Sequence, residues 1–296
     1  MWISAWLNGR RQRVALNGTF SSWLPVKSGV PQGSVLGPSL FLIFINDIDD
    51  EISSHVLKFA DDTKVFTRIE DENDALSLQD DINKLHLWSE KWQMLFNVSK
   101  CKILHFGHNN HRFNYFMNGQ PLETVNEEKD LGVIVSSSLK LNTQVVACVK
   151  RANRILGMIY RTFETKELVL MLQLYKSLVR PHLEFAIQAW NPYLKGDIDY
   201  LEKVQRRFTR MIPVLQHLPY NERLSALNLT TLSTRRLRGD LIEAFKIMKG
   251  FVKASPQLWF EFSDISFTRG HSMKLCAKYS KLNVRRHFFS VRVVSE

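Results

Sequence analysis

The sequence lacks the features of a secreted, disulfide-bonded or membrane-spanning protein. It has only three cysteines, Cys101, Cys148 and Cys276, which are widely separated. An odd and sparse set argues against a disulfide framework and for a reducing compartment. The longest apolar run, residues 40–45, is far shorter than the ~20 residues of a membrane helix. The first residues also lack the basic segment, apolar core and cleavage site of a signal peptide. These absences predict an intracellular protein of the nucleus or cytoplasm, not secreted and with no membrane partner.

Acidic residues are scarce in the second half of the chain. The net charge is +11, but residues 1–139 carry a balance of −4 and residues 140–296 a balance of +15. A basic surface of this kind attracts the phosphate backbone of nucleic acids by counterion release, without reading sequence. A merely soluble basic surface is the simpler alternative. With 45% hydrophobic and 23% charged residues, the composition is that of a globular protein of one large or two ordinary domains.

Two adjacent carboxylates, Asp61 and Asp62, stand between an apolar run at 55–59 and a β-prone run at 63–67. The pattern predicts a tight hairpin with the acidic pair at its turn. Carboxylates this close repel each other and do not both stay ionised without a compensating cation. Mg²⁺ suits this role, because it takes a few carboxylate oxygens and completes its shell with substrate phosphates. The pair alone does not exclude an ordinary polar turn.

A glycine-rich segment lies about thirty residues upstream and reads SGVPQGSVLGPSLF over residues 28–41. Its glycines suit a turn that needs conformational freedom. Gly37 predicts a close backbone approach, and Pro38 is tolerated only in the first turn of the helix that follows.

Periodicity predicts an α+β protein whose first half is an antiparallel sheet backed by helices. Hairpins are expected around residues 17–18 and 118–119, because Asn-Gly separates β-prone runs at both places. A helix is expected at 71–92, and strands at 94–106 and 131–135. The second half is expected to be helical, with apolar stripes through 145–163 and 201–212. Segment 168–190 is expected to be one buried helix, and another helix, with a basic first turn, is expected to begin at 234. Loops ending in a basic strand at 283–294 complete the expectation.

The segments 28–41 and 59–62, in this order and spacing, resemble motifs B and C of a reverse transcriptase. More narrowly, they resemble those of non-LTR (LINE-type) retrotransposons of the chicken-repeat-1/jockey group. Residues 88–94 and 96–102 are similar to motif D, residues 129–133 to motif E, and residues 174–184 and 201–207 to the thumb of the same group. The similarity runs through almost the whole chain.

The resemblance implies a domain organisation. Residues 1–139 are expected to form a partial palm with motifs B to E, residues 140–252 a helical basic thumb or connection region, and residues 253–296 a basic extension. Motif A, which carries another metal-binding Asp, has no counterpart here, since the first residues resemble the helix that follows it. The expectation is therefore an N-terminally truncated polymerase without fingers or endonuclease. Asp47, Asp49 and Asp50 follow the motif B helix, where a polar cap explains them better than a replacement for the motif A Asp.

The resemblance also assigns roles to residues. Asp61 is the expected metal ligand and Asp62 a supporting carboxylate. Lys100, with Lys102 as its competitor, is the expected motif D lysine that protonates pyrophosphate or neutralises its charge. The Pro31-Gln32-Gly33-Ser34 turn is expected to contact template and incoming nucleotide, and Leu131 with Gly132 to form the primer grip. Contacts to the nucleic-acid backbone are expected from basic residues of three helices, namely Lys150, Arg151, Arg154, Lys203, Arg206, Arg207, Arg210, Arg235 and Arg236.

The expected activity is RNA-directed DNA polymerisation with an RNA template, a DNA primer and deoxynucleoside triphosphates. The complete enzyme uses two Mg²⁺ ions, one to activate the primer 3′-hydroxyl and one to hold the triphosphate. In a chain with only the motif C carboxylates, Mg²⁺ binding is expected to be weak or absent and the chain alone inactive. Two alternatives are a non-catalytic nucleic-acid-binding protein that uses the basic half, and an inert remnant.

Overall fold

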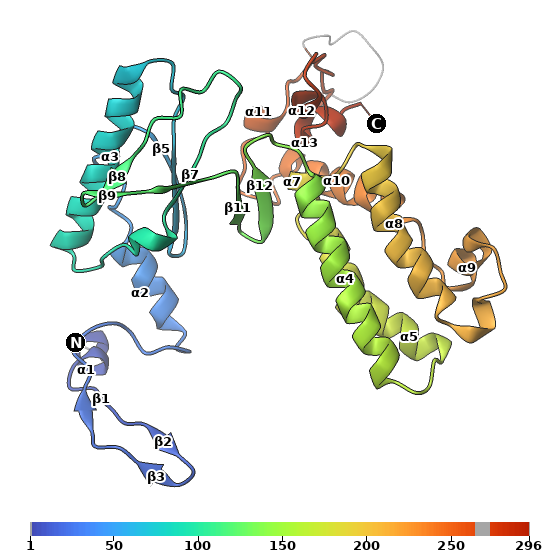
Figure 1. Cartoon of the computed structure of the whole chain (residues 1–296), viewed down its shortest axis with the longest axis horizontal. Helices are drawn as coiled ribbons and strands as arrows, with labels where there is room; N and C mark the ends of the chain where they lie inside the picture. Colours follow the sequence, from blue (N-terminus) through green and yellow to red (C-terminus); the bar gives the residue numbers. More distant parts are fainter. Residues whose placement is uncertain (1, 264–272, 296) are drawn as a thin grey trace. The chain divides into compact units, whose positions relative to one another are not determined.

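The computed structural model describes residues 2–263 and 273–295. The chain divides into two compact units, residues 1–103 with 109–124, and residues 104–108 with 125–296. Both combine helices with small antiparallel sheets (Figure 1), so the α+β prediction is confirmed at that coarse level. The finer division into palm, thumb and extension stays a prediction. No helix in the described part of the chain is long and apolar enough to cross a membrane.

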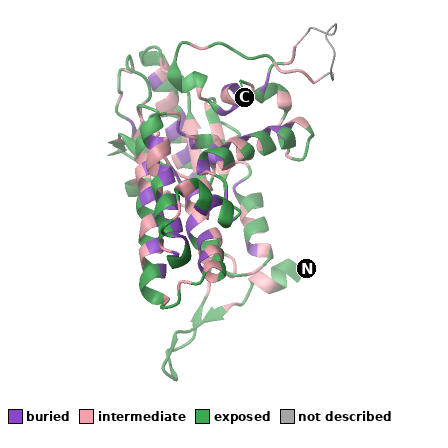
Figure 2. Ribbon diagram, turned by 90° about the vertical axis from the view of Figure 1, so that its right-hand side faces the viewer, coloured by how far each residue is buried: buried purple, intermediate pink, exposed green. Residues whose placement is uncertain are grey.

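The first unit begins with a short helix and an exposed ribbon. After α1 (Trp2–Leu7), strand β1 (Arg11–Gln12) pairs with β4 (Leu24–Pro25), and β2 (Ala15–Leu16) pairs with β3 (Thr19–Phe20). Asn17 and Gly18 connect β2 to β3 with φ of 48° and 80°, which confirms the predicted hairpin. Figure 2 shows these strands as exposed.

The centre of this unit is a hairpin and a long helix. Helix α2 (Leu36–Phe44) precedes the hairpin of β5 (His55–Phe59) and β6 (Asp62–Phe66), and α3 (Glu72–Lys91) follows. The helix predicted at 71–92 from the spacing of its apolar residues is confirmed. Asp71 caps α3, because its carboxylate accepts from the Asp74 N–H at 3.0 Å.

The apolar side of α3 packs on the strands that come after it. A 3₁₀ turn (Val98–Lys100) leads to β7 (Lys102–Leu104), which pairs with β10 (Glu123–Val125). Between them, β8 (Phe116–Met117) and β9 (Gln120–Pro121) form the hairpin predicted around 118–119. The Gln79 side chain of α3 binds the backbone of Phe116 in β8. Its amide nitrogen donates to the Phe116 carbonyl (2.7 Å), and its amide oxygen accepts from the Phe116 N–H (2.8 Å). The prediction of one continuous strand at 94–106 was wrong, because the 3₁₀ turn at 98–100 interrupts it.

The second unit is mainly helical. After the hairpin of β11 (Glu127–Asp130) and β12 (Val133–Ser136) come α4 (Asn142–Thr162), α8 (Lys195–Arg210), α9 (Tyr220–Ala226) and α10 (Leu232–Met248). The predicted stripes of α4 and α8 are confirmed as buried and belong to one core, whose members include Val145, Val149, Leu156, Leu201, Val204 and Phe208. A 3₁₀ turn (Pro213–Leu215) separates α8 from α9.

The segment 168–190 is not the single helix that was predicted. It forms α5 (Leu168–Leu174), a π-helical turn (Tyr175–Val179), α6 (Arg180–Glu184) and α7 (Ile187–Trp190). Pro181 has no N–H to donate to the preceding turn, which explains the irregular hydrogen bonding there. Ala186, with φ of 52°, breaks the helix before α7.

The end of the chain also differs from the prediction. Helix α11 (Pro256–Trp259) is followed by α12 (Asn283–Arg286) and α13 (Phe289–Arg292), where a basic strand was expected at 283–294. Phe289 and Val293 pack with Ala244, Ile247 and Phe260 in a separate small core, which favours helix because apolar side chains at positions i and i+4 share a face. Residues 264–272 of the expected extension lie outside the described residues.

Candidate functional site

The acidic pair lies at the tip of the β5–β6 hairpin. Phe59 is paired with Asp62, so Ala60 and Asp61 form a two-residue loop and Asp62 opens β6. Such a loop needs a positive φ at its first position, and Ala60 has φ of 52°. Alanine lacks the freedom of glycine there, and strain of this kind is characteristic of functional sites. The predicted hairpin is confirmed, with both carboxylates at its exposed end.

Asp61 and Asp62 are open to a ligand, whereas two nearby aspartates are not. Among the residues that the structure describes, neither Asp61 nor Asp62 has an ion-pair or hydrogen-bond partner for its carboxylate. Asp47 accepts from the Trp88 indole N–H at 3.0 Å, and Asp49 pairs with the Lys58 ammonium. This agrees with the interpretation of Asp47 and Asp49 as structural. Within residues 2–263 and 273–295, no three His, Cys, Asp or Glu side chains gather as a metal site.

The glycine-rich segment forms a compact turn before α2. The Ser34 hydroxyl donates to the Pro31 carbonyl at 2.8 Å and accepts from the Gly37 N–H at 3.0 Å. A Cβ on Gly37 would lie 2.9 Å from the Ser34 Oγ, which confirms the predicted close approach. Gly33 has φ of 77°, and it is exposed together with Gln32. The turn therefore holds its Gln32-Gly33 tip toward solvent.

The two lysines considered for motif D, Lys100 and Lys102, differ in their surroundings. Lys102 forms an ion pair with Glu123, and its ammonium also donates to the Ser99 carbonyl at 2.9 Å. Lys100 is exposed on the 3₁₀ turn, and no ion pair involves it in the described part of the chain. Lys100 is thus the lysine whose charge is available to a ligand.

Leu131 and Gly132 form the two-residue loop between β11 and β12. Their φ angles of 44° and 91° are those of a type I′ turn, and Leu131 is exposed. Leu131 was predicted to begin a buried strand, which was wrong, because the strand starts at Val133. A Cβ on Gly132 would lie 3.0 Å from the Phe185 ring, so the loop rests on that side chain.

The basic residues of α4 and α8 lie on helix surfaces. All seven are exposed, and they are Lys150, Arg151 and Arg154 of α4 and Lys203, Arg206, Arg207 and Arg210 of α8. Arg207 donates to the Asn153 side chain at 3.0 Å. Among the described residues none of the seven forms an ion pair with a carboxylate, so their charge is available to an external anion.

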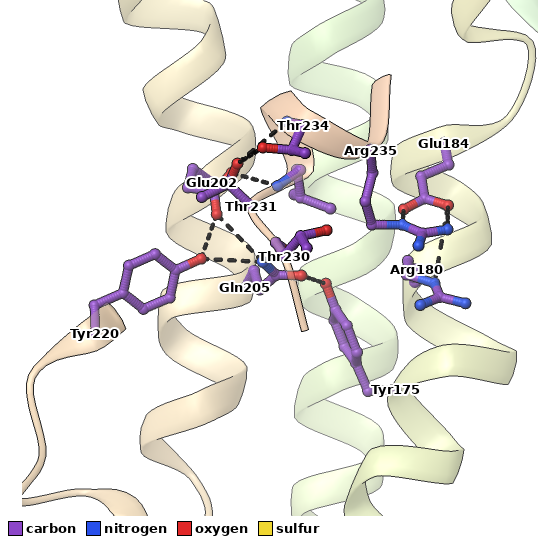
Figure 3. Close-up of polar contacts among 11 residues, drawn as sticks. Tyr175, Arg180, Glu184, Glu202, Gln205, Tyr220, Thr230, Thr231, Thr234 and Arg235 are labelled. Carbon is purple, nitrogen blue, oxygen red and sulfur yellow. Dashed lines mark hydrogen bonds and ion pairs between the residues drawn. The ribbon is translucent and has the colours of Figure 1, made fainter. Parts of the chain in front are cut away.

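Of the remaining two arginines, both in α10, Arg235 is half-buried and Arg236 is buried. Arg235 makes a forked ion pair with Glu184 (Figure 3), with Nη2 to Oε2 at 2.9 Å. Arg236 is only 2% exposed and lies near Glu202, Glu184 and Asp240. A protein carboxylate therefore accounts for the charge of Arg235, whereas Arg236 is closed to solvent and its Nη1 has no hydrogen-bond partner. That corrects the expectation that a nucleic acid accounts for the basic first turn of this helix.

A buried polar network joins α8 to α9 and α10, and the sequence analysis did not find it. Gln205 donates to the Thr230 carbonyl (3.0 Å) and to the Tyr220 hydroxyl (3.1 Å), and it accepts from the Tyr175 hydroxyl (2.8 Å). Glu202 accepts from the Tyr220 hydroxyl (Figure 3). It also accepts from the Leu232 N–H at 2.9 Å. Burial raises the pKa of Tyr175, so its hydroxyl stays a donor. The only signal in the sequence is a polar pair, Glu202 and Gln205, beside the apolar stripe of α8.

Comparison with known proteins identifies the family. The family model described as reverse transcriptase (RNA-dependent DNA polymerase) matches residues 1–158, more than half of the chain. The chain belongs to this family. No solved structure matches the chain significantly.

The similar curated proteins come from mobile elements. The chain is 27% identical over 224 residues to the RNA-directed DNA polymerase from mobile element jockey of Drosophila melanogaster, and 30% identical over 225 residues to that of Drosophila funebris. It is 26% identical to the probable RNA-directed DNA polymerase from transposon X-element of Drosophila melanogaster. Each match covers 71% of this chain and 24% of the relative, so the chain spans about a quarter of the length of these proteins. The prediction of a jockey-like non-LTR reverse transcriptase is confirmed.

Proposed function

We propose that this chain contributes the motif C carboxylates and a nucleic-acid-binding helical region to an RNA-directed DNA polymerase of a jockey-like retrotransposon. One observation carries the proposal: Asp61 and Asp62 stand at the tip of a two-residue hairpin turn with no competing partner among the described residues. The template is RNA, the primer is DNA, and the monomers are deoxynucleoside triphosphates, as the names of the jockey relatives suggest.

The residues present suit Mg²⁺ as part of a ligand set. Mg²⁺ keeps several waters and is held by one or two carboxylates together with substrate phosphates, and two exposed, unpaired carboxylates offer that kind of donor. Asp61 and Asp62 would hold the metal. When bound, the ions supply positive charge that activates the primer 3′-hydroxyl and stabilises the leaving pyrophosphate.

The other residues position the substrates. The Gln32-Gly33 tip would contact the template and the incoming nucleotide, and the Leu131-Gly132 loop would support the primer end. The exposed Lys100 ammonium would neutralise the pyrophosphate or give it a proton. The exposed arginines and lysines of α4 and α8 would bind the backbone of the RNA–DNA duplex, which a protein recognises by shape and phosphates more than by bases.

A Mn²⁺ titration of the 296-residue chain tests the metal-binding role, with Mn²⁺ as a paramagnetic substitute for Mg²⁺. We expect weak binding that disappears in Asp61→Asn/Asp62→Asn. The matched control is Asp50→Asn/Glu51→Gln, which neutralises another exposed and adjacent acidic pair and should leave the binding unchanged. Equal loss in both variants, or no loss in the first, would contradict the assignment.

A second candidate function is non-catalytic nucleic-acid binding by the helical unit. The seven exposed basic side chains of α4 and α8, which have no carboxylate partners among the described residues, favour it. It predicts that Asp61→Asn/Asp62→Asn leaves binding of an RNA–DNA hybrid intact in the presence and absence of Mg²⁺. The polymerase proposal instead predicts that these carboxylates matter for any Mg²⁺-dependent part of the binding.

A further inference from the structure

A cavity of about 860 Å³ lies between the C-terminal half of α8, the segment that follows it, and α9. Six of the side chains that line it are cationic: Lys166, Lys203, Arg206, Arg207, Arg210 and Arg223. No Asp or Glu is among the described residues that line it. Four of the six cationic residues belong to the exposed face of α8, and the cavity adds Lys166 and Arg223, which no sequence pattern singled out.

Arg223 is the unusual member of this group. Its side chain is 2% exposed, yet its Nε and Nη1 have no hydrogen-bond partner, and no carboxylate pairs with it in the described part of the chain. Burial, and next the charge of nearby Arg210, lower the pKa of the Arg223 guanidinium. Buried charges in proteins are normally paired, because a buried group without a partner is costly. Arg223 lines the cavity and its charge has no carboxylate partner among the described residues, so an anionic ligand in the cavity would compensate it.

Tyr220 fixes the geometry of this arginine cluster. The guanidinium carbons of Arg206 and Arg223 lie 5.1 Å and 5.6 Å from the centroid of the Tyr220 ring, within the range of cation–π contacts. The ring is itself held, because its hydroxyl donates to Glu202 and accepts from Gln205 (Figure 3). Two guanidinium groups are thus positioned in advance around one ring, which lowers the entropic cost of binding a shared anion.

The rest of the lining suggests what carries the anion. Met211, Pro213, Leu218 and Pro219 give the cavity an apolar wall, and the exposed ring of Tyr160 lies at its edge. Binding sites for single-stranded nucleic acid combine cationic groups for the backbone with apolar and aromatic surfaces for the bases. A regular duplex presents its phosphates on a stiff convex surface, whereas a single strand bends and places one phosphate inside a cavity.

We infer that this cavity binds a single-stranded segment of nucleic acid, with one phosphate on Arg206, Arg210 and Arg223 and the adjoining base against the apolar wall. The inference rests on the proposed nucleic-acid function of the helical unit. The site shares Arg206 and Arg210 with the proposed duplex contacts and adds Arg223, which is specific to the unpaired strand. It gives the enzyme a place to hold the template or primer strand outside the hybrid.

Binding of two fluorescent probes tests this inference. One probe is a single-stranded oligouridylate, the other an RNA–DNA hybrid with the same number of phosphates, and both are titrated into the full chain by anisotropy. We expect Arg223→Gln to lower the affinity for the single strand about tenfold, because a charge-assisted interaction with a phosphate is lost. The affinity for the hybrid should change less than twofold, since a duplex does not reach a side chain so deeply buried.

A second variant guards against a folding defect in the first. The double variant Arg206→Gln/Arg210→Gln changes exposed residues, so it should leave the thermal unfolding temperature unaltered. It should flatten the slope of log single-strand affinity against log salt by about 0.7, the value for one phosphate on a single strand. The matched control is Lys249→Gln/Lys253→Gln, which removes two exposed charges of the same unit away from the cavity and should leave single-strand affinity within twofold.

The outcomes separate the two proposals. Single-strand binding that is insensitive to Arg223→Gln, or hybrid binding that falls by the same factor as single-strand binding in Arg223→Gln, would overturn the cavity assignment alone. Failure of the wild-type chain to bind the hybrid, with intact and Arg223-dependent binding of the single strand, would contradict only the proposed duplex function.

Discussion

Neutralising the basic face of α8 should change how the affinity for an RNA–DNA hybrid responds to salt. The perturbation is the replacement of Lys203, Arg206, Arg207 and Arg210 by glutamine. All four are exposed and none is in an ion pair among the described residues, so each is free to neutralise a phosphate. If each does so, the slope of log affinity against log salt flattens by up to about 3–4, at ~0.9 per phosphate for a B-form duplex.

The change in slope has a large effect on affinity. Between 50 and 200 mM salt, a slope difference of about 3.6 means that the wild type loses about a hundredfold more affinity than the variant. The hybrid is A-form, so the comparison between the two proteins matters more than either absolute slope.

Folding should be almost unaffected by these four changes. Leu201, Val204 and Phe208 hold the other side of α8 in the core, and the Phe208 ring stacks on Tyr175 at 4.1 Å. Anisotropy titrations at five or more salt concentrations measure the slope, and circular dichroism checks the fold. An unchanged slope in a folded variant would refute the reasoning, because these residues would then face only solvent or another protein.

Three further predictions concern the stability and activity of the chain. Asp81 is fully buried; burial acts to raise its pKa, but hydrogen bonds from Ser54 and Ser53 outweigh it and lower the pKa. This carboxylate therefore contributes stability that is fully present above pH 3.8, the ordinary value, and is lost as the pH falls through the lowered pKa. Asp81→Asn should cost about 2–3 kcal/mol in urea unfolding at pH 7 and weaken the acid dependence, and equal stability of the two proteins at pH 7 would contradict this. Gly132→Ala should cost about 1–2 kcal/mol, since φ is 91° and a Cβ would crowd the Phe185 ring; a neutral effect in thermal unfolding would mean that the β11–β12 loop is not held there. Primer extension on RNA by the 296-residue chain should be undetectable, and calorimetry should find no tight Mg²⁺ site. Extension that vanished on Asp61→Ala would contradict the expectation that a chain with only the motif C carboxylates is inactive alone.

Local patterns predicted turns and helix ends better than they predicted long segments. The Asp61-Asp62 hairpin, the Asn-Gly hairpins and the α3 cap all depend on residues within a few positions of one another, where turn chemistry and helix spacing decide the structure. The close approach at Gly37 could be predicted for the same reason.

Features that depend on tertiary partners could not be predicted in this way. The basic pair Arg235-Arg236 resembled a phosphate-binding turn, because Glu184 and Glu202 are distant in the sequence and become neighbours only in the fold. The break in segment 168–190 depends on Ala186 adopting a left-handed conformation, which its identity does not favour. The burial of Arg223 likewise arises from packing of α9 rather than from its own neighbours in the sequence.

The central claim is that Asp61 and its hairpin serve as the motif C carboxylates of a polymerase. The most direct measurement uses the jockey enzyme of Drosophila melanogaster in which the segment matching this chain is replaced by the corresponding residues of this chain. We predict RNA-templated primer extension by this chimera, abolished by Asp61→Asn and retained with the nearby exposed Asp50→Asn. Extension that survives Asp61→Asn, or that is lost equally in both variants, would contradict the account.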